Sequence, residues 1–474
     1  MVWTAVTPVP DLLLSKPVVA PPLDAGFAPI SLGDRQYHQT VAAAKTKVPL
    51  AIALERNDGR VSVFTTEILP AGSSHDAATR LYVERLVKFL LWQIGGWKIV
   101  IGGPRGMGDF IAQTYAHDGA RAFDVKLMEQ VYEKRFVVET VDYTKSPATN
   151  ESSMALGGHL NGCRVGFDLG ASDYKLAAVK DGEAVFTTEI PWDPRPQSDP
   201  DWHYQKINEG LKLAAKHLPR VDAIGGSSAG IYIDNKVMVA SLFRGVPPEF
   251  FTQKIKPLFL NLRKEWGVPF EAANDGDVTA LAGAMSLREN GVLGIAMGSS
   301  QAAGFLDNSG RITGWLNELA FAPIDYNPRA AVDEWSGDTG CGVQCFSQQA
   351  VVRLAPVAGI ELPNSHPAEQ LKFVQELHQQ GDPRPPKIFE TIGVYLGYAL
   401  AHYADMYDFR HLLVLGRVTS GAGGDLIVQM AKEVLRADFP ELAQKLSLHL
   451  PDEKSKRVGQ AVAAASLPSL ETEV

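Results

Sequence analysis

The spacing of apolar residues predicts alternating strands and helices from Pro49 onward. LAIALE and VSVFTTEI alternate as half-buried strands do, and residues 57–59 (Asn-Asp-Gly) between them suit a hairpin turn. Apolar residues then recur at helical intervals between Ala78 and Leu91. Similar strand and helix patterns continue to the C-terminus, with mostly helices in the last third. Such alternation is typical of an α/β protein.

Two stretches interrupt this pattern. Residues 1–36 contain six prolines, which exclude regular helix and central strand. We interpret them as an extended arm on the surface of this chain or of a partner. Residues 143–163 are rich in Ser, Asn and Gly and lose all periodicity, as a linker does.

The chain after the linker repeats the chain before it. VFTTEI begins at Val63 and again at Val185, an offset of 122 residues, and Ile-Gly-Gly begins at Ile101 and Ile224, an offset of 123. Two anchors at nearly constant offset favour duplication. The first copy has only LAIALERN before its Asp-Gly turn, where the second has VGFDLGASDYKLAAVK. Residues 37–142 are therefore predicted to keep the framework and to lack a phosphate-binding turn.

Composition limits the class of protein. The 474 residues are 45% hydrophobic and 21% charged, which is globular composition. The net charge of −9 is spread along the chain, so neither nucleic acid nor an anionic membrane is expected as a partner. Three cysteines are too few for a disulfide framework, and no apolar run is long enough to span a membrane. We expect a cytoplasmic protein.

Three glycine-rich turns are candidates for binding a nucleotide. Small residues let backbone N–H groups approach phosphate oxygens, and serine hydroxyls donate to them. An Asp beside such a turn can hold magnesium through water, and Asp168 is that residue. Each turn alone is ordinary, but the set favours a phosphate site. The candidate nucleotide-binding residues are Asp168, Gly170, Ser172, Gly298, Ser299, Ser300, Gly416, Gly423 and Gly424.

An Asn-Asp pair, Asn274 and Asp275, ends the strand VPFEAA. A carboxylate there suits a general base. The structural alternative is that Asp275 caps the next helix, which we place from Val278. Asp277 can cap instead, which leaves Asp275 free for catalysis.

These motifs resemble the ROK (repressor, ORF, kinase) family of sugar kinases, within the actin, hexokinase and heat-shock ATPase superfamily. The resemblance covers about residues 164–474, with an echo in 49–142. It implies a two-lobed actin-like ATPase (ribonuclease H-like) fold, with a truncated duplicate of the first lobe at the N-terminus. The first lobe would be residues 164–290 with a closing helix from 452–474, and the second lobe residues 291–451.

The resemblance also assigns roles. DLGAS and GSS match the hairpins that embrace ATP, with Mg²⁺ held at Asp168. Asp275 would take the proton from the attacking hydroxyl, Asn274 would bind a sugar hydroxyl, and Glu318 in NELAF would contact the sugar. Ser241 stands where it can substitute for the family's sugar-contacting Asn.

The chain departs from the family at its zinc site. Phe321 stands in place of the ligand His, and GCGVQC offers only Cys341 and Cys345. Two thiolates do not make a tetrahedral site, so no structural zinc is expected. Ser347 stands where the family has an acidic residue, and the family's sugar-contacting Asn is absent at Ser241. These losses fall on the acceptor side and favour an altered sugar or polyol over glucose.

The sequence therefore predicts ATP- and Mg²⁺-dependent phosphorylation of a sugar-like hydroxyl. The alternative is a catalytically inactive nucleotide- or sugar-binding sensor or assembly protein on a kinase scaffold. A third hypothesis is that the extra lobe imitates a partner subunit. The predicted protein is a monomer or a homodimer.

Overall fold

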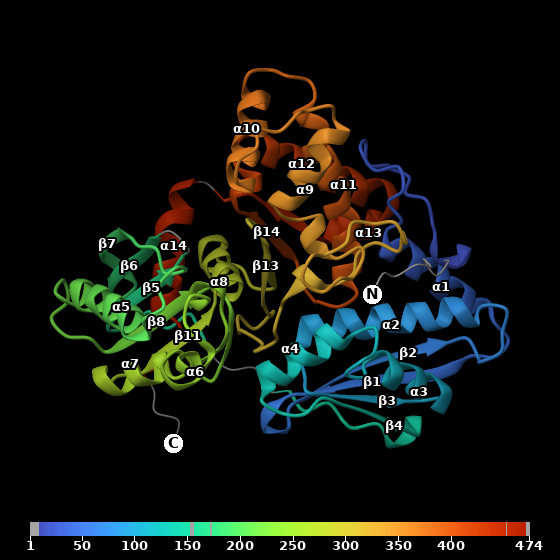
Figure 1. The fold of residues 1–474 in the computed structure, drawn as a ribbon, viewed down its shortest axis with the longest axis horizontal. Coiled ribbons are helices and arrows are strands. Elements are labelled where there is room, and N and C mark those ends of the chain that lie inside the picture. The colour runs from blue at the N-terminus through green and yellow to red at the C-terminus, as the bar shows by residue number, and fades with distance from the viewer. Residues whose placement is uncertain (1–8, 152–155, 171–172, 452, 471–474) are drawn as a thin grey trace.

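The computed structural model describes residues 9–151, 156–170, 173–451 and 453–470. Its three main sheets, each flanked by helices, form three bodies (Figure 1). We call them the N-terminal unit (residues 48–141), the first lobe (residues 163–287, with 453–465) and the second lobe (residues 292–449). The predicted α/β class with two lobes is confirmed. No helix among the described residues is long and apolar enough to cross a membrane.

The first lobe is built on a five-stranded sheet with the order β11-β8-β5-β6-β7. Strands β5, β8 and β11 are parallel, and β6 and β7 are antiparallel to their neighbours. The elements are β5 (Cys163–Leu169), β6 (Asp173–Lys180), β7 (Glu183–Pro191), α5 (Pro200–Ala215), β8 (Ala223–Ser228), β9 (Ile231–Ile233), β10 (Lys236–Val239), α6 (Pro248–Phe250), α7 (Leu258–Trp266), β11 (Phe270–Asn274) and α8 (Asp275–Leu287).

Helix α14 (Glu453–Ala465) lies directly on this sheet, in contact with β5, β6 and β8. A Cβ at Gly166 of β5 would lie 1.8 Å from the Ala461 carbonyl oxygen, and one at Gly225 of β8 would lie 1.7 Å from that of Ala464. Only glycine allows this approach.

The second lobe has a four-stranded sheet with the order β13-β12-β14-β15, beside a group of helices. Its buried apolar residues form one continuous core with those of the N-terminal unit. The elements are β12 (Val292–Met297), β13 (Gln301–Leu306), α9 (Gln348–Val357), α10 (Pro367–Gln379), α11 (Pro385–Ala404), β14 (His411–Leu415), α12 (Ala422–Asp438), α13 (Pro440–Lys445) and β15 (Ser447–His449).

The N-terminal unit has the sheet order β2-β1-β3-β4. Strand β1 is antiparallel to both β2 and β3, and β3 is parallel to β4. Taking β5 out of the first lobe's order leaves the same order with the same directions. The elements are β1 (Val48–Glu55), β2 (Val61–Ile68), α2 (Asp76–Ile94), β3 (Lys98–Gly102), α3 (Arg105–Thr114), α4 (Ala122–Tyr132) and β4 (Val137–Val141).

This correspondence supports the predicted duplication, which itself stays a prediction. It also identifies the missing strand. The repeated VFTTEI lies in β2 and β7, and the repeated Ile-Gly-Gly in or at the end of β3 and β8. The counterpart of β5, the strand that carries Asp168, is absent from the N-terminal sheet.

The predicted arm is shorter than residues 1–36, because helix α1 (Ile30–Ala43) begins directly after Pro29. The described part of the arm lies along the second lobe of its own chain (Figure 1). The Leu23 N–H donates to Thr391 Oγ1 at 3.2 Å, and the Val19 N–H donates to the Tyr398 hydroxyl at 3.2 Å. Within the predicted linker, Asn150 pairs with Val61 of β2.

Candidate active site

Asp168 lies near the end of β5, at the centre of the first lobe's sheet, and its side chain is held on both sides. Ser227 Oγ of the adjacent β8 donates to Asp168 Oδ1 at 2.7 Å. Lys175, directly opposite on β6, places Nζ 3.3 Å from Asp168 Oδ2. Asp168 is 5% exposed. A buried carboxylate is stable in its charged form when it is paired and hydrogen-bonded in this way.

Asp275 is the first residue of α8 and does not cap it. The cap is Asn274, whose Oδ1 accepts from the Gly276 N–H at 2.7 Å. The helix therefore begins at Asp275 and not at Val278, and neither aspartate is needed as its cap. Burial, with the negative charge of Asp168 second, raises the pKa of Asp275 to about 6. Such a carboxylate is ionised at neutral pH yet basic enough to accept a proton.

The two aspartates belong to the same sheet edge. Strands β5, β8 and β11 are parallel neighbours, and Asp168 and Asp275 come from the carboxyl ends of β5 and β11. This is the edge at which parallel α/β sheets bind their ligands. Asp275 also lies at the seam between the lobes, because Gly276 contacts β13. A Cβ at Gly276 would lie 2.1 Å from the Ala303 carbonyl oxygen.

Glu318 is electrostatically coupled to Asp275. Burial, followed by the charges of Asp275 and Asp277, raises the pKa of Glu318 to about 8, so this carboxyl group is protonated at neutral pH. Asp277 is buried, and Asn317 Nδ2 donates to its Oδ1 at 2.9 Å. The Tyr407 hydroxyl donates to Asn317 Oδ1 at 3.0 Å. A hydrogen-bonded chain therefore fixes the residue before Glu318.

The glycine turns of the second lobe lie side by side. The Gly298 N–H donates to the Ser300 carbonyl at 2.9 Å, which closes the β12–β13 turn and leaves Ser299 and Ser300 exposed. Gly416 follows β14 with φ of 104°, and a Cβ there would lie 2.4 Å from the Met297 carbonyl oxygen. This close approach places the predicted turn at Gly416 beside the turn from Gly298 to Ser300.

Two other predicted glycines are explained by packing. A Cβ at Gly423 would lie 2.8 Å from the Phe389 ring, and one at Gly424 would lie 2.2 Å from the Thr419 carbonyl oxygen. Both are buried. Their nucleotide-binding role stays a prediction. In the first hairpin, the Gly170 N–H donates to the Asp173 carbonyl at 2.9 Å, while Ser172 lies outside the described residues.

A pocket lies beside Asn274 and Asp277. Each of the three bodies contributes to its walls: Asn274 and Tyr232 from the first lobe, Trp315 and Leu316 from the second lobe, and Arg56 from the N-terminal unit. Asp275, Glu318 and Ser241 do not line it. The Asn274 amide is already engaged, because its Nδ2 donates to the Gly230 carbonyl at 2.7 Å.

Among the described residues, no hydrogen bond or ion pair links Ser241 to Asp168, Asp275 or Glu318. It is exposed and begins the 3-10 turn Ser241–Phe243. Sequence reasoning missed Ser227, Asn317 and Gln460, whose Nε2 donates to the Asp275 carbonyl at 3.3 Å. Such polar residues carry no signal in the sequence until their partners are known.

The position of the family's zinc site holds other contacts. The Phe321 ring packs 4.3 Å from Trp92 and 5.6 Å from Phe123, measured between ring centroids. Cys341 Sγ lies 3.8 Å from Asp338 Oδ2, and burial raises the pKa of Cys341 to about 12.

Asp168 offers a carboxylate oxygen, the kind of ligand that magnesium prefers. The described residues contain no group of three His, Cys, Asp or Glu arranged to hold a metal by themselves. Magnesium characteristically takes only one or two carboxylates and completes its shell with water and nucleotide phosphates. Asp168 fits this mode if Lys175 releases its Oδ2.

Comparisons with known proteins agree with this architecture. No protein-family model matches the chain, and no curated protein matches it in sequence. A ROK hexokinase from Thermus thermophilus superposes with a TM-score of 0.51 at 16% identity, covering 64% of this chain and 97% of its own. A ROK-family transcriptional regulator, a homologue of the E. coli MLC protein, gives 0.53 at 20% identity, covering 65% and 79%.

A ROK-family glucokinase from Streptomyces griseus, solved with glucose and AMPPNP, gives 0.49 at 21% identity, covering 64% and 99%. About two thirds of the chain therefore has the fold of ROK-family proteins, as the motifs predicted. Because the fold is shared by hexokinase and regulator, activity has to be argued from the site.

Proposed function

We propose that the protein transfers a phosphoryl group from ATP to a hydroxyl of a sugar or polyol. The observation that carries this proposal is Asp275, a carboxylate at a helix N-terminus and a sheet edge with its pKa raised to about 6. Its own side chain is not used to cap α8, since Asn274 does so. It is therefore available to accept the proton of an attacking hydroxyl.

The other residues take supporting roles. Asp168 holds Mg²⁺ through water, which neutralises charge on the donor phosphates. The turn from Gly298 to Ser300 offers backbone N–H groups and hydroxyls to the phosphates. Glu318, protonated at neutral pH, donates a hydrogen bond to the acceptor. The pocket lined by Asn274 and Trp315 lies next to this group but is not lined by Asp275 or Glu318.

The test is ADP release from ATP with a panel of sugars and polyols. Asp275→Asn is expected to lower sugar-stimulated turnover by about 10²–10⁴-fold, the usual contribution of a general base. Asp76→Asn is the matched control, because Asp76 is also the first residue of a helix, α2, and its carboxylate pairs with Arg80 at the surface. Equal turnover in wild type and Asp275→Asn would refute the assignment.

A nucleotide- or sugar-binding sensor is the second candidate function. Two observations favour it: Lys175 occupies Asp168 Oδ2, and both polar groups of the Asn274 side chain are bonded to protein. A sensor would bind ATP or a sugar without turnover of any acceptor in the panel, whereas a kinase would release ADP with at least one.

A further inference from the structure

We propose that the N-terminal unit holds residues 316–318, which we call the Glu318 segment, in position through helix α2. This inference rests on the proposed function for the role of Glu318 as an acceptor-binding residue. Helix α2 also contacts this segment directly, whatever the role of Glu318.

The C-terminal end of α2 is bonded to the backbone around Glu318. The Glu318 N–H donates to the Trp92 carbonyl at 3.0 Å, and the Asn317 N–H donates to the Gln93 carbonyl at 2.9 Å. The last carbonyls of a helix have no partner within it and need one from elsewhere. Here the segment that carries Glu318 supplies that partner.

Asn317 shows that this attachment sets the backbone conformation. Its φ is 52°, in the left-handed region that few residues other than glycine adopt. Both polar groups of its side chain are bonded, to Asp277 and Tyr407. The segment is thus held from one side by α2 and from the other by the second lobe and α8.

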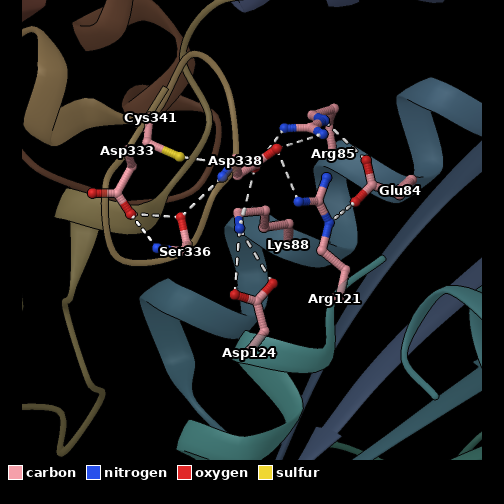
Figure 2. A network of polar contacts seen from close by, with 9 residues as sticks. All are labelled: Glu84, Arg85, Lys88, Arg121, Asp124, Asp333, Ser336, Asp338 and Cys341. Atoms are coloured by element: carbon pink, nitrogen blue, oxygen red, sulfur yellow. Dashed lines mark hydrogen bonds and ion pairs between the residues drawn. The ribbon is translucent and has the colours of Figure 1, made fainter. Parts of the chain in front are cut away.

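A buried charge network holds the following loop to the same helix (Figure 2). Arg85 of α2 forms two hydrogen bonds with the Asp338 carboxylate, at 2.8 and 3.2 Å. Lys88 of α2 lies 3.2 Å from Asp338, and Arg121 lies 2.9 Å from it. Three cationic side chains of the N-terminal unit therefore contact the Asp338 carboxylate.

The network is balanced within itself. Glu84 pairs with Arg85 and Arg121, and Asp124 pairs with Lys88, so three cations face three anions. All six side chains are at most 12% exposed. Removing one member leaves the others uncompensated in a site that water does not reach.

The loop of Asp338 is continuous with the Glu318 segment through backbone pairing. The Ile324 N–H donates to the Gly340 carbonyl at 2.8 Å, and the Gly342 N–H donates to the Ala322 carbonyl at 3.0 Å. A displacement of Asp338 is therefore expected to shift the backbone at Glu318 as well. Asp338 and Gly95 are positioning residues in this scheme.

Gly95, at the end of α2, offers the sharper variant. Its φ is 82°, and a Cβ there would lie 2.7 Å from Leu316 Cγ and 2.0 Å from the Tyr132 hydroxyl. Gly95→Ala would push directly on the Glu318 segment. Gly72→Ala is the matched control, because Gly72 has a similar φ of 77° but a Cβ there meets nothing within 4 Å.

The experiment is amide hydrogen exchange by mass spectrometry on the full chain, for Gly95→Ala, Asp338→Asn and Gly72→Ala. In the first two variants, exchange in residues 316–345 is expected to speed up by about tenfold, with 173–180 at the wild-type rate. Gly72→Ala is expected to match wild type throughout. With an active acceptor in hand, the acceptor KM rises in the first two variants while the nucleotide KM does not change.

Unchanged exchange in residues 316–345 of Gly95→Ala overturns the proposal. So does an equal rise in 173–180, or an equal response of Gly72→Ala, since each would indicate general destabilisation. If the wild type turns over no acceptor, the proposed function fails, and hydrogen exchange alone decides whether α2 orders this segment.

Discussion

The N-terminal sheet and the first lobe's sheet share an order of strands but differ in their centre. In the first lobe, β5 lies between β6 and β8 and carries Asp168. In the N-terminal unit, the corresponding neighbours β1 and β3 pair directly and antiparallel. Without the central strand the N-terminal sheet is still continuously hydrogen-bonded, but it has no counterpart of Asp168 or of its turn. The N-terminal sheet therefore lacks the strand that supplies Asp168 to the candidate site.

The two regions also use buried carboxylates differently. In the N-terminal unit, Glu84 is surrounded by cations, chiefly Arg121, that hold its pKa below the usual range against the effect of burial. At the candidate site, Asp277 and Glu318 have no cation against them in the interactions described, and burial raises the pKa of each to about 7 and about 8. The charge pairs of the N-terminal unit stabilise contacts between its elements. At the candidate site, burial keeps carboxyl groups next to Asp275 protonated.

The largest expected effect separates the two sheets by function. Asp168→Asn should lower turnover by about 10²–10³-fold, the loss typical of a missing electrostatic contact in a preorganised site. Glu55→Gln is the matched change in the N-terminal sheet. Glu55 ends β1, and its Oε2 lies 3.7 Å from Lys98 Nζ, much as Asp168 Oδ2 lies 3.3 Å from Lys175 Nζ. Turnover of Glu55→Gln should equal that of wild type. A comparable loss in both variants would break the comparison.

Stability should not separate the two sheets. Ile101 and Ile224 begin the repeated Ile-Gly-Gly phrase, and both are fully buried. Ile101→Ala and Ile224→Ala should each lower the free energy of unfolding by about 2–5 kcal/mol, because each leaves a cavity in a packed core. Urea unfolding measures both. A loss well below this range for Ile101→Ala alone would mean that the N-terminal sheet is not part of the main core.

A smaller effect follows from the raised pKa of Asp277. A carboxyl whose folded pKa is about 7 adds stability at low pH, and that contribution is lost as pH rises through 7. Between pH 5 and 7 this group should lower the free energy of unfolding by up to about 1.4 kcal/mol per pH unit. Asp277→Asn should flatten the dependence in urea unfolding at pH 5, 6 and 7. An unchanged slope would show that Asp277 is ionised in the folded protein.

The sequence predicted the framework well because strands and helices follow local patterns. Apolar alternation and turn residues located β1, β2 and β5 to β8, and helical spacing located α2. The pattern failed at α1, where Pro29 precedes a helix and not more arm, and at α3, whose few apolar residues give a weak signal.

The candidate site was predictable only where a motif is continuous. Asp168 and Asp275 could be chosen from short motifs, whereas the capping role of Asn274 depends on where α8 starts in space. The network around Asp338 joins residues more than 200 positions apart. Its local signs are Glu84 and Lys88, two charged residues among the buried, mostly apolar residues of α2.

The most direct test of the central claim is where, and how many times, the chain binds ATP. Photolabelling with an azido-ATP analogue in Mg²⁺, with titration calorimetry, should give one nucleotide per chain, with labelled peptides from the first and second lobes near β5, β12 and β14. Asp168→Asn should lose that label. Two nucleotides per chain, or a label confined to residues 48–141, would contradict the claim that the candidate chemistry belongs to the sheet that contains β5.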